Sequence, residues 1–176
     1  MRQPVTLNRL QKFMDTFGAA TAAPVRVYLV GGATAVLLGW RDATIDIDLK
    51  ILPESDEVLR SLPRLKESLQ LNVELAAPDD FIPELPGWQE RSRFIGQIGK
   101  ATFLHYDFYG QALAKIERGH ATDLRDVNEL IQAGLVETRR MLEFFTVIEP
   151  QLYRYPAVDG PSFRRAVERI VAEARQ

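Results

Sequence analysis

Hydrophobic and polar residues alternate along the first part of the chain in a way that predicts short strands between helices. The run Val25–Val30 is short and rich in β-branched and aromatic residues, which predicts a buried strand. Residues 43–52 predict a second strand, and residues 71–76 predict a third near the edge of the sheet. The stretches Arg93–Ile98 and Ala101–His105 predict a hairpin that turns at the Gly-Lys pair between them.

Apolar residues at helical spacing predict helices around these strands and throughout the C-terminal part. The first helix begins after the capping residue Thr6 and continues to about Phe17. Ser55 begins another helix that reaches about Leu69, with a kink or a division into two helices at Pro63. The remaining predicted helices cover residues 33–38, 107–118, 122–133, 137–149 and 162–175.

This order of elements predicts an α+β fold, with a mixed sheet flanked by helices and a C-terminal helical bundle. We expect residues 1–105 to form the α/β core and residues 106–176 to pack on it, as one compact unit. The proline-rich stretch 78–87 predicts a loop that could cover a site.

Composition excludes several kinds of site. The 176 residues include no cysteine, which excludes disulfides, thiolate metal sites and a cysteine nucleophile. The two histidines, His105 and His120, are too few for a histidine-rich zinc site, and we expect both to be structural. No long apolar run and no apolar signal core occur, so we expect a cytoplasmic protein without a membrane partner. The net charge of −2 shows no general attraction to nucleic acid.

Two aspartates, Asp46 and Asp48, are the most informative feature of the predicted strand 43–52. Side chains at i and i+2 of a strand point to the same face, so the two carboxylates can reach one divalent cation. The strand therefore predicts one polar face, with Thr44, Asp46, Asp48 and Lys50, and one core face, with Ile45, Ile47, Leu49 and Ile51. Carboxylate oxygens suit Mg²⁺ or Mn²⁺, whereas the alternative interpretation is a solvated polar face.

Glu74 adds a third carboxylate on the next predicted strand. If that strand pairs beside the aspartates, all three carboxylates share one face and can hold two metal ions for phosphoryl transfer. The alternative is a solvated position on an edge strand. The turn Gly31-Gly32 follows a strand and precedes a helix, so its backbone amides can approach a phosphate. It matches neither a P-loop nor a dinucleotide-binding fingerprint.

A second charged cluster lies between two predicted C-terminal helices. Lys115 and Arg118 are at i and i+3 on one helix face, which suits triphosphate oxygens. Asp123 lies in the first turn of the next helix, and Asp126 follows one turn later. The alternative interpretation is a set of ion pairs between the two helices.

These motifs together resemble the DNA polymerase beta-like nucleotidyltransferase superfamily, whose signature is a strand, a Gly-Gly turn, a short helix, an Asp-x-Asp pair and a later acidic residue. Within it, residues 41–49 and the segment from Lys115 to Asp126 are similar to the abortive-infection-type nucleotidyltransferases, which are toxins of bacterial toxin–antitoxin pairs. The resemblance covers roughly residues 25–133.

The resemblance implies a role for each matching residue. Asp46, Asp48 and Glu74 would hold Mg²⁺ or Mn²⁺, and Glu74 or, in its place, Asp123 would activate the acceptor, with Asp126 supporting Asp123. Contacts to the nucleoside triphosphate (NTP) would come from Gly31, Gly32, Thr44, Lys115 and Arg118.

The expected reaction is transfer of a nucleoside monophosphate (NMP) from an NTP to a hydroxyl of tRNA, a protein or a small molecule. A cognate antitoxin is an expected partner of a toxin. A basic patch for an RNA acceptor would draw on Arg91, Arg93, Lys100, Arg139 and Arg140. Two alternatives stay open: an antibiotic nucleotidyltransferase, and a catalytically inactive module that binds a nucleotide or a partner.

Overall fold

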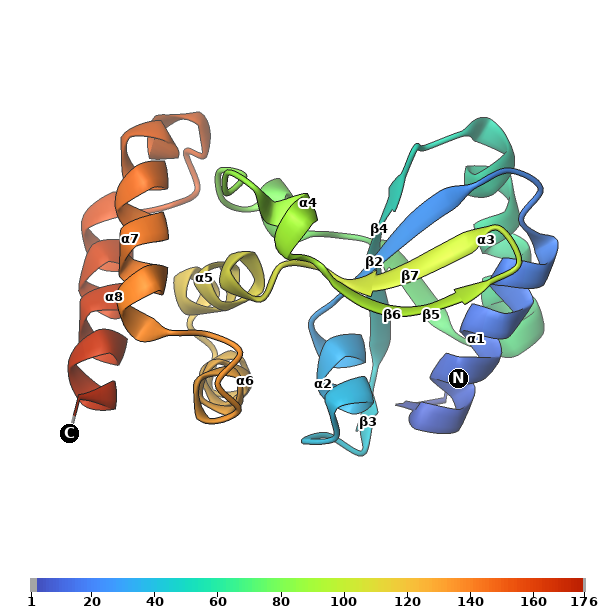
Figure 1. Ribbon diagram of the computed structural model, residues 1–176, viewed down its shortest axis with the longest axis horizontal. Helices are drawn as coiled ribbons and strands as arrows, with labels where there is room; N and C mark the ends of the chain where they lie inside the picture. Colours follow the sequence, from blue (N-terminus) through green and yellow to red (C-terminus); the bar gives the residue numbers. More distant parts are fainter. Residues whose placement is uncertain (1–2, 176) are drawn as a thin grey trace. The chain divides into compact units, whose positions relative to one another are not determined.

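The chain folds into two compact units that each combine separate stretches of the sequence. The computed structural model describes residues 3–175. Unit 1 contains the chain through Ala77 together with Ser92–Tyr106, and unit 2 contains Pro78–Arg91 together with the chain from Asp107 onward. The predicted α+β class is confirmed, because unit 1 holds a mixed sheet with helices and unit 2 is helical (Figure 1).

A five-stranded mixed sheet forms the centre of unit 1. Its order is β5 (Asn72–Leu75), β4 (Asp46–Leu52), β2 (Val25–Val30), β7 (Ala101–His105) and β6 (Arg93–Ile98). The pairs β4–β5 and β2–β7 are parallel, whereas β2–β4 and β6–β7 are antiparallel. The predicted edge position of the third strand and the predicted hairpin are therefore confirmed.

The prediction of one continuous strand over residues 43–52 is wrong at Ile45. Ala43–Thr44 form a separate short strand, β3, which pairs with β1 (Val5–Thr6) in a two-stranded sheet. The chain bends at Ile45, whose side chain is 80% exposed rather than in the core. The physical reason is that the pairing of Thr44 with Val5 ends before the ladder of β4 begins, so the alternation does not continue across the bend.

Three helices complete unit 1: α1 (Leu7–Ala20), α2 (Gly32–Leu38) and α3 (Asp56–Leu69). The predicted caps are present, because the side chain of Thr6 accepts from the amide of Arg9 and that of Ser55 accepts from the amide of Val58. A division of α3 at Pro63 is not observed. Leu62 and Leu65 on either side of this proline are both buried, and their packing outweighs the one backbone hydrogen bond that proline removes.

The core of unit 1 lies on one face of its sheet. Residues of α1, α2 and α3 are buried there against the apolar side chains of β2, β4, β5 and β7. Ile47, Leu49 and Ile51 of β4 belong to this core, as their alternation predicts. The opposite face of β4 therefore carries the residues in between, which include both aspartates.

Unit 2 is built from helices and short turns. Its elements are η1 (Pro78–Asp80), α4 (Trp88–Arg91), α5 (Phe108–Arg118), α6 (Ala121–Gln132), α7 (Thr138–Ile148), η2 (Glu149–Arg154) and α8 (Gly160–Ala174). Helices α7 and α8 run side by side (Figure 1), with the rings of Phe145 and Phe163 4.8 Å apart. Across residues 3–175, every helix is too short or too polar to cross a bilayer.

Candidate functional site

The acidic residues of β4 and β5 lie side by side on one face of the sheet in unit 1. The parallel register places Asp46 beside Asn72 and Asp48 beside Glu74. Because paired residues of neighbouring strands point to the same face, Asp46, Asp48 and Glu74 share the face opposite the core. The structure thus brings together the three carboxylates that the sequence pattern indicated.

Asn72 is part of this acidic face, although the sequence reasoning assigned it no role. Its side-chain amide donates to Oδ1 of Asp46 and, at 3.0 Å, to Oε1 of Glu74. An amide donor between two carboxylates reduces their mutual repulsion. The sequence did contain a signal for this role. Asn72 is two residues from Glu74 on a strand, and that spacing places both side chains on one face.

The donor chemistry of this face fits a hard divalent cation. Carboxylate oxygens are the ligands that Mg²⁺ and Mn²⁺ prefer, and a rotated Asn72 amide would add a carbonyl oxygen. Within the described residues, no three acidic or histidine side chains are already gathered closely enough to hold a metal ion. A site in which all three carboxylates bind one cation therefore requires Asp46, Asp48 or Glu74 to change rotamer.

The glycine turn after β2 lies directly against this acidic face. Gly31 has φ of 62° and ψ of −123°, a conformation that only glycine adopts without strain. A Cβ on Gly31 would lie 3.8 Å from Oδ2 of Asp48, so the backbone of the turn is close to that carboxylate. A Cβ on Gly32 would lie 2.0 Å from Oγ1 of Thr44, which explains why this position also needs glycine.

A buried histidine holds the start of α2 against the sheet. Nδ1 of His105, at the end of β7, lies 3.0 Å from Oγ1 of Thr34, and both side chains are buried. Burial, together with the positive charge of Arg93, lowers the pKa of His105 to about 4. The histidine is therefore neutral at pH 7, which agrees with the structural role expected for it.

The charged cluster predicted near the C-terminal helices forms ion pairs within unit 2. Nζ of Lys115 donates to Oδ2 of Asp126 at 2.8 Å and lies 3.7 Å from Oδ1 of Asp123. Nε of Arg118 donates to Oδ2 of Asp123 at 2.8 Å. The interpretation as ion pairs between α5 and α6 therefore describes the structure, and a phosphate would have to compete with Asp126 for Lys115.

Asp123 is held in its ionised form by this cluster. Burial alone would raise the pKa of its carboxyl, but the hydrogen bond and charge of Arg118 and the charge of Lys115 outweigh burial and lower it. A carboxylate with a lowered pKa and two cationic partners is a weak proton acceptor. This environment suits a structural or orienting role for Asp123 better than that of a general base.

The residues of the expected basic patch are divided between the two units. Arg91 pairs with Asp107, the capping residue of α5, with Nη2 2.8 Å from Oδ2, and its guanidinium lies 4.2 Å from the ring centroid of Phe144. Arg139 pairs with Glu143, and Arg140 lies over Tyr109 and Phe144. In unit 1, Arg93 and Lys100 are exposed.

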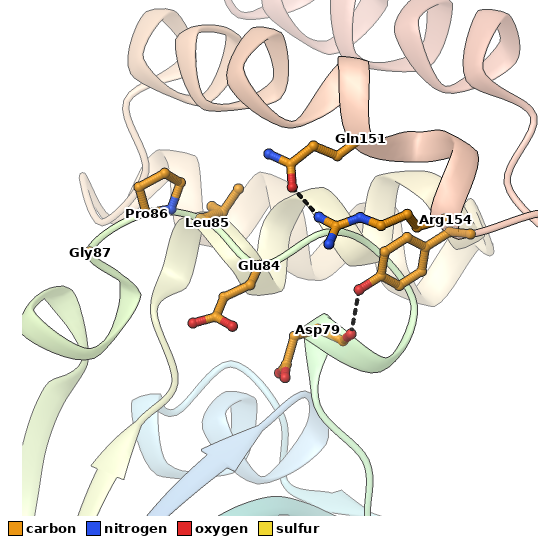
Figure 2. A pocket seen from close by; sticks show the side chains of 8 residues that line it. Asp79, Glu84, Leu85, Pro86, Gly87, Gln151 and Arg154 are labelled. Carbon is orange, nitrogen blue, oxygen red and sulfur yellow. Dashed lines mark hydrogen bonds between the residues drawn. The ribbon is translucent and has the colours of Figure 1, made fainter.

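A pocket of about 380 Å³ lies within unit 2, between the predicted loop of residues 78–87 and the segment that contains Gln151, Arg154 and Tyr155. Figure 2 shows the side chains of Asp79 and Glu84 on one side and those of Gln151 and Arg154 on the other. The hydroxyl of Tyr155 donates to the backbone oxygen of Asp79 at 3.0 Å and so ties η2 to η1. The pocket therefore presents both signs of charge.

Comparison with solved structures shows a similarity of fold. The chain matches no protein family model and no curated protein sequence. It is similar to the crystal structure of an antigenic nucleotidyltransferase-like protein from Paracoccidioides brasiliensis, with a TM-score of 0.52 and 14% sequence identity over 94% of this chain and 95% of that one. At this identity the match describes the fold alone. The chain has an α+β fold similar to that of a nucleotidyltransferase-like protein.

Proposed function

We propose that this chain is a nucleotidyltransferase that uses Mg²⁺ or Mn²⁺ to transfer NMP from an NTP to an acceptor hydroxyl. The observation that carries the proposal is the position of the Gly31 backbone beside Asp48, on the sheet face that also holds Asp46 and Glu74. Backbone amides next to carboxylates can seat a phosphate and its cation together. The similarity of fold to a nucleotidyltransferase-like protein supports it.

In the proposed site, Asp46, Asp48 and Glu74 would hold the cation through their oxygens. When bound, Mg²⁺ would offset the phosphate charge and stabilise the charge that develops on the reacting oxygens. Gly31 and Gly32 would bring backbone amides to the phosphates without a Cβ in the way. Thr44 packs against Gly32 and would fix the conformation of that turn.

The proposed reaction forms one bond to phosphorus and breaks another. The acceptor oxygen attacks the α-phosphorus, the bond from that phosphorus to the oxygen bridging it to the β-phosphorus breaks, and pyrophosphate leaves with the bonding electrons. The acceptor proton passes to a carboxylate. Glu74 is exposed and lies beside Asp48, whereas Asp123 is buried against two cations, which supports Glu74 as the acceptor of this proton.

The finer assignments belong to the same proposal. Lys115 and Arg118 would contact the triphosphate only after exchanging Asp126 and Asp123 for phosphate oxygens. The resemblance of residues 41–49 and 115–126 to abortive-infection-type enzymes supports a toxin that has a cognate antitoxin. Its acceptor would be a hydroxyl of tRNA, a protein or a small molecule.

A transfer assay tests this function. The chain is incubated with each labelled NTP, Mg²⁺ or Mn²⁺, and either tRNA, the protein itself or an aminoglycoside as acceptor. We expect label to appear on one acceptor. Asp46→Asn should reduce the transfer rate by more than roughly 100-fold, because mutating even a residue that only hydrogen-bonds to a metal ligand typically lowers metal affinity or activity 10–100-fold. Asp15→Asn on α1 is the matched control, since Asp15 is exposed on a helix that packs on the opposite face.

Three other outcomes would each revise a different part of the proposal. Transfer that persists in Asp46→Asn and Asp48→Asn would overturn the site. NTP binding without transfer to any acceptor would favour the catalytically inactive binding module. The absence of both NTP binding and transfer would remove the nucleotidyltransferase function itself.

A further inference from the structure

A second pocket, entirely within unit 1, lies at the end of the sheet away from the aspartates. It is open to solvent and has a volume of about 380 Å³, a size found among small-molecule sites. The ends of β2 and β4 and the turn between β6 and β7 surround it. Its lining residues are Pro24, Val25, Arg26, Leu52, Pro53, Gln97, Lys100 and Thr102. None of these residues is acidic.

Four of the lining residues form one row across the sheet. The register pairs Arg26 with Leu52 on one side and with Thr102 on the other, and it pairs Thr102 with Gln97. Paired residues share a face, so a guanidinium, a hydroxyl and an amide stand next to one another on neighbouring strands. The fold therefore builds this row from three separate parts of the chain.

The polar groups of this pocket favour an anion. The exposed guanidinium of Arg26 forms no ion pair with any other residue in the range 3–175. Nζ of Lys100 donates to the backbone oxygen of Ala22 at 2.9 Å, which leaves further ammonium hydrogens for a ligand. An arginine and a lysine without a neighbouring carboxylate are a typical setting for phosphate oxygens.

The remaining lining residues favour a ligand with an apolar part. Pro24, Leu52 and Pro53 contribute apolar surface beside the cationic groups. Free phosphate would leave that surface unused, whereas an organic phosphate would cover it with its carbon skeleton. The row lies on the same face of the sheet as Asp48 but at its other end, because Arg26 is four residues along β2 from Val30, the partner of Asp48, which is about 13 Å.

We infer that this pocket is a binding site for a small organic phosphate, separate from the proposed nucleotidyl-transfer site. Arg26 and Lys100 would bind the phosphoryl oxygens, Thr102 and Gln97 would donate further hydrogen bonds, and Leu52 with the two prolines would contact the organic part. The inference does not depend on the transfer reaction, because it uses none of the residues proposed to hold the cation or the NTP.

Calorimetric titration of the full chain tests this inference with two probes, inorganic phosphate and phenyl phosphate. We expect phenyl phosphate to bind at least about tenfold more tightly, because its ring buries apolar surface. Arg26→Gln and Lys100→Gln should each weaken both probes by about tenfold or more, because each removes a charge-assisted contact. Leu52→Ala should weaken phenyl phosphate alone. Arg64→Gln, an exposed arginine on α3, is the matched control and should change neither affinity.

Several results would overturn the inference. Equal binding by Arg26→Gln and Arg64→Gln would place the anion elsewhere, and equal affinity for the two probes would reduce the pocket to a site for free phosphate. No binding of either probe at millimolar concentration would remove the site. Failure of NMP transfer, by contrast, would leave the inference intact.

Discussion

At the scale of single residues, close contacts explain why small or neutral side chains occupy particular positions near the acidic face. A Cβ on Gly32 would meet Oγ1 of Thr44 at 2.0 Å, so the turn and the end of β3 can approach only when this position is glycine. The Gly-Gly pair was visible in the sequence, but this contact was not, because the two residues belong to separate elements. The role of Asn72 was not predicted for the same reason, because its hydrogen-bond partners Asp46 and Glu74 come close only when β4 pairs with β5.

His105 leads to a prediction about the pH dependence of stability. Its pKa is lowered to about 4 in the folded chain and returns to 6.5 on unfolding, so the unfolded state binds more protons between these values. Stability from the neutral histidine is complete above pH 6.5 and is lost as the pH falls toward 4. We expect this loss to reach about 2–3 kcal/mol at pH 4.5.

The measurement is urea unfolding at pH 7 and at pH 4.5. The difference in unfolding free energy between the two pH values should be smaller in His105→Gln than in the unsubstituted chain by that amount. Asn8→Gln serves as the control, because Asn8 is exposed on α1 and does not titrate. An unchanged pH dependence in His105→Gln would contradict the prediction.

At the scale of elements, local patterns predicted most helices and strands, and failures occurred where distant segments decide the outcome. The strand Val25–Val30 and the hairpin of β6 and β7 have the predicted bounds, because period-two alternation and turn residues specify them locally. The bend at Ile45 depends on pairing between Thr44 and Val5, which no local pattern encodes. The single helix α3 depends on core contacts of Leu62 and Leu65 that outweigh the propensity of Pro63.

The ion pairs between α5 and α6 lead to a prediction at this scale. Lys115 is 9% exposed, and its Nζ is 2.8 Å from Oδ2 of Asp126, which is 2% exposed. Asp126→Ala removes the hydrogen-bonded partner of this buried ammonium group and leaves only Asp123, 3.7 Å away, so it should destabilise the chain by about 1.5–3 kcal/mol. Urea unfolding measures this cost, and adding Lys115→Met to Asp126→Ala should restore part of it, because the ammonium group that lost its hydrogen-bond acceptor is then absent.

The exposed pair Arg139–Glu143 on α7 is the control for this measurement. Their side chains are 81% and 65% exposed, so Glu143→Gln should cost less than about 1 kcal/mol. If Asp126→Ala and Glu143→Gln lower the free energy of unfolding by similar amounts, the prediction is contradicted, because the buried ion pair would then contribute no more to stability than the exposed one.

At the scale of the whole molecule, the proposed functional residues fall into two groups that belong to different units. Unit 1 holds the glycine turn and Asp46, Asp48 and Glu74, whereas unit 2 holds the ion-paired cluster of Lys115, Arg118 and Asp123. The sequence motifs assigned all of these residues to one site. Motifs cannot show which side chains form ion pairs with one another in the folded chain, so this part of the prediction needed the structure. In unit 1, the donor set of the acidic face suits a cation, whereas in unit 2 the charges of the cluster already pair with one another.

This difference between the two groups of residues leads to a prediction about where a metal ion binds. A cation that binds only the folded state raises stability by about 1.4 kcal/mol at ten times its Kd, which corresponds to a rise in Tm of about 3–5 °C. Mn²⁺ should therefore raise the Tm of the unsubstituted chain and of Asp123→Asn, each compared with its own metal-free Tm. The rise should be absent in Asp46→Asn and Asp48→Asn and reduced in Glu74→Gln. A rise that is lost in Asp123→Asn but retained in Asp46→Asn, Asp48→Asn and Glu74→Gln would place the cation in unit 2 instead.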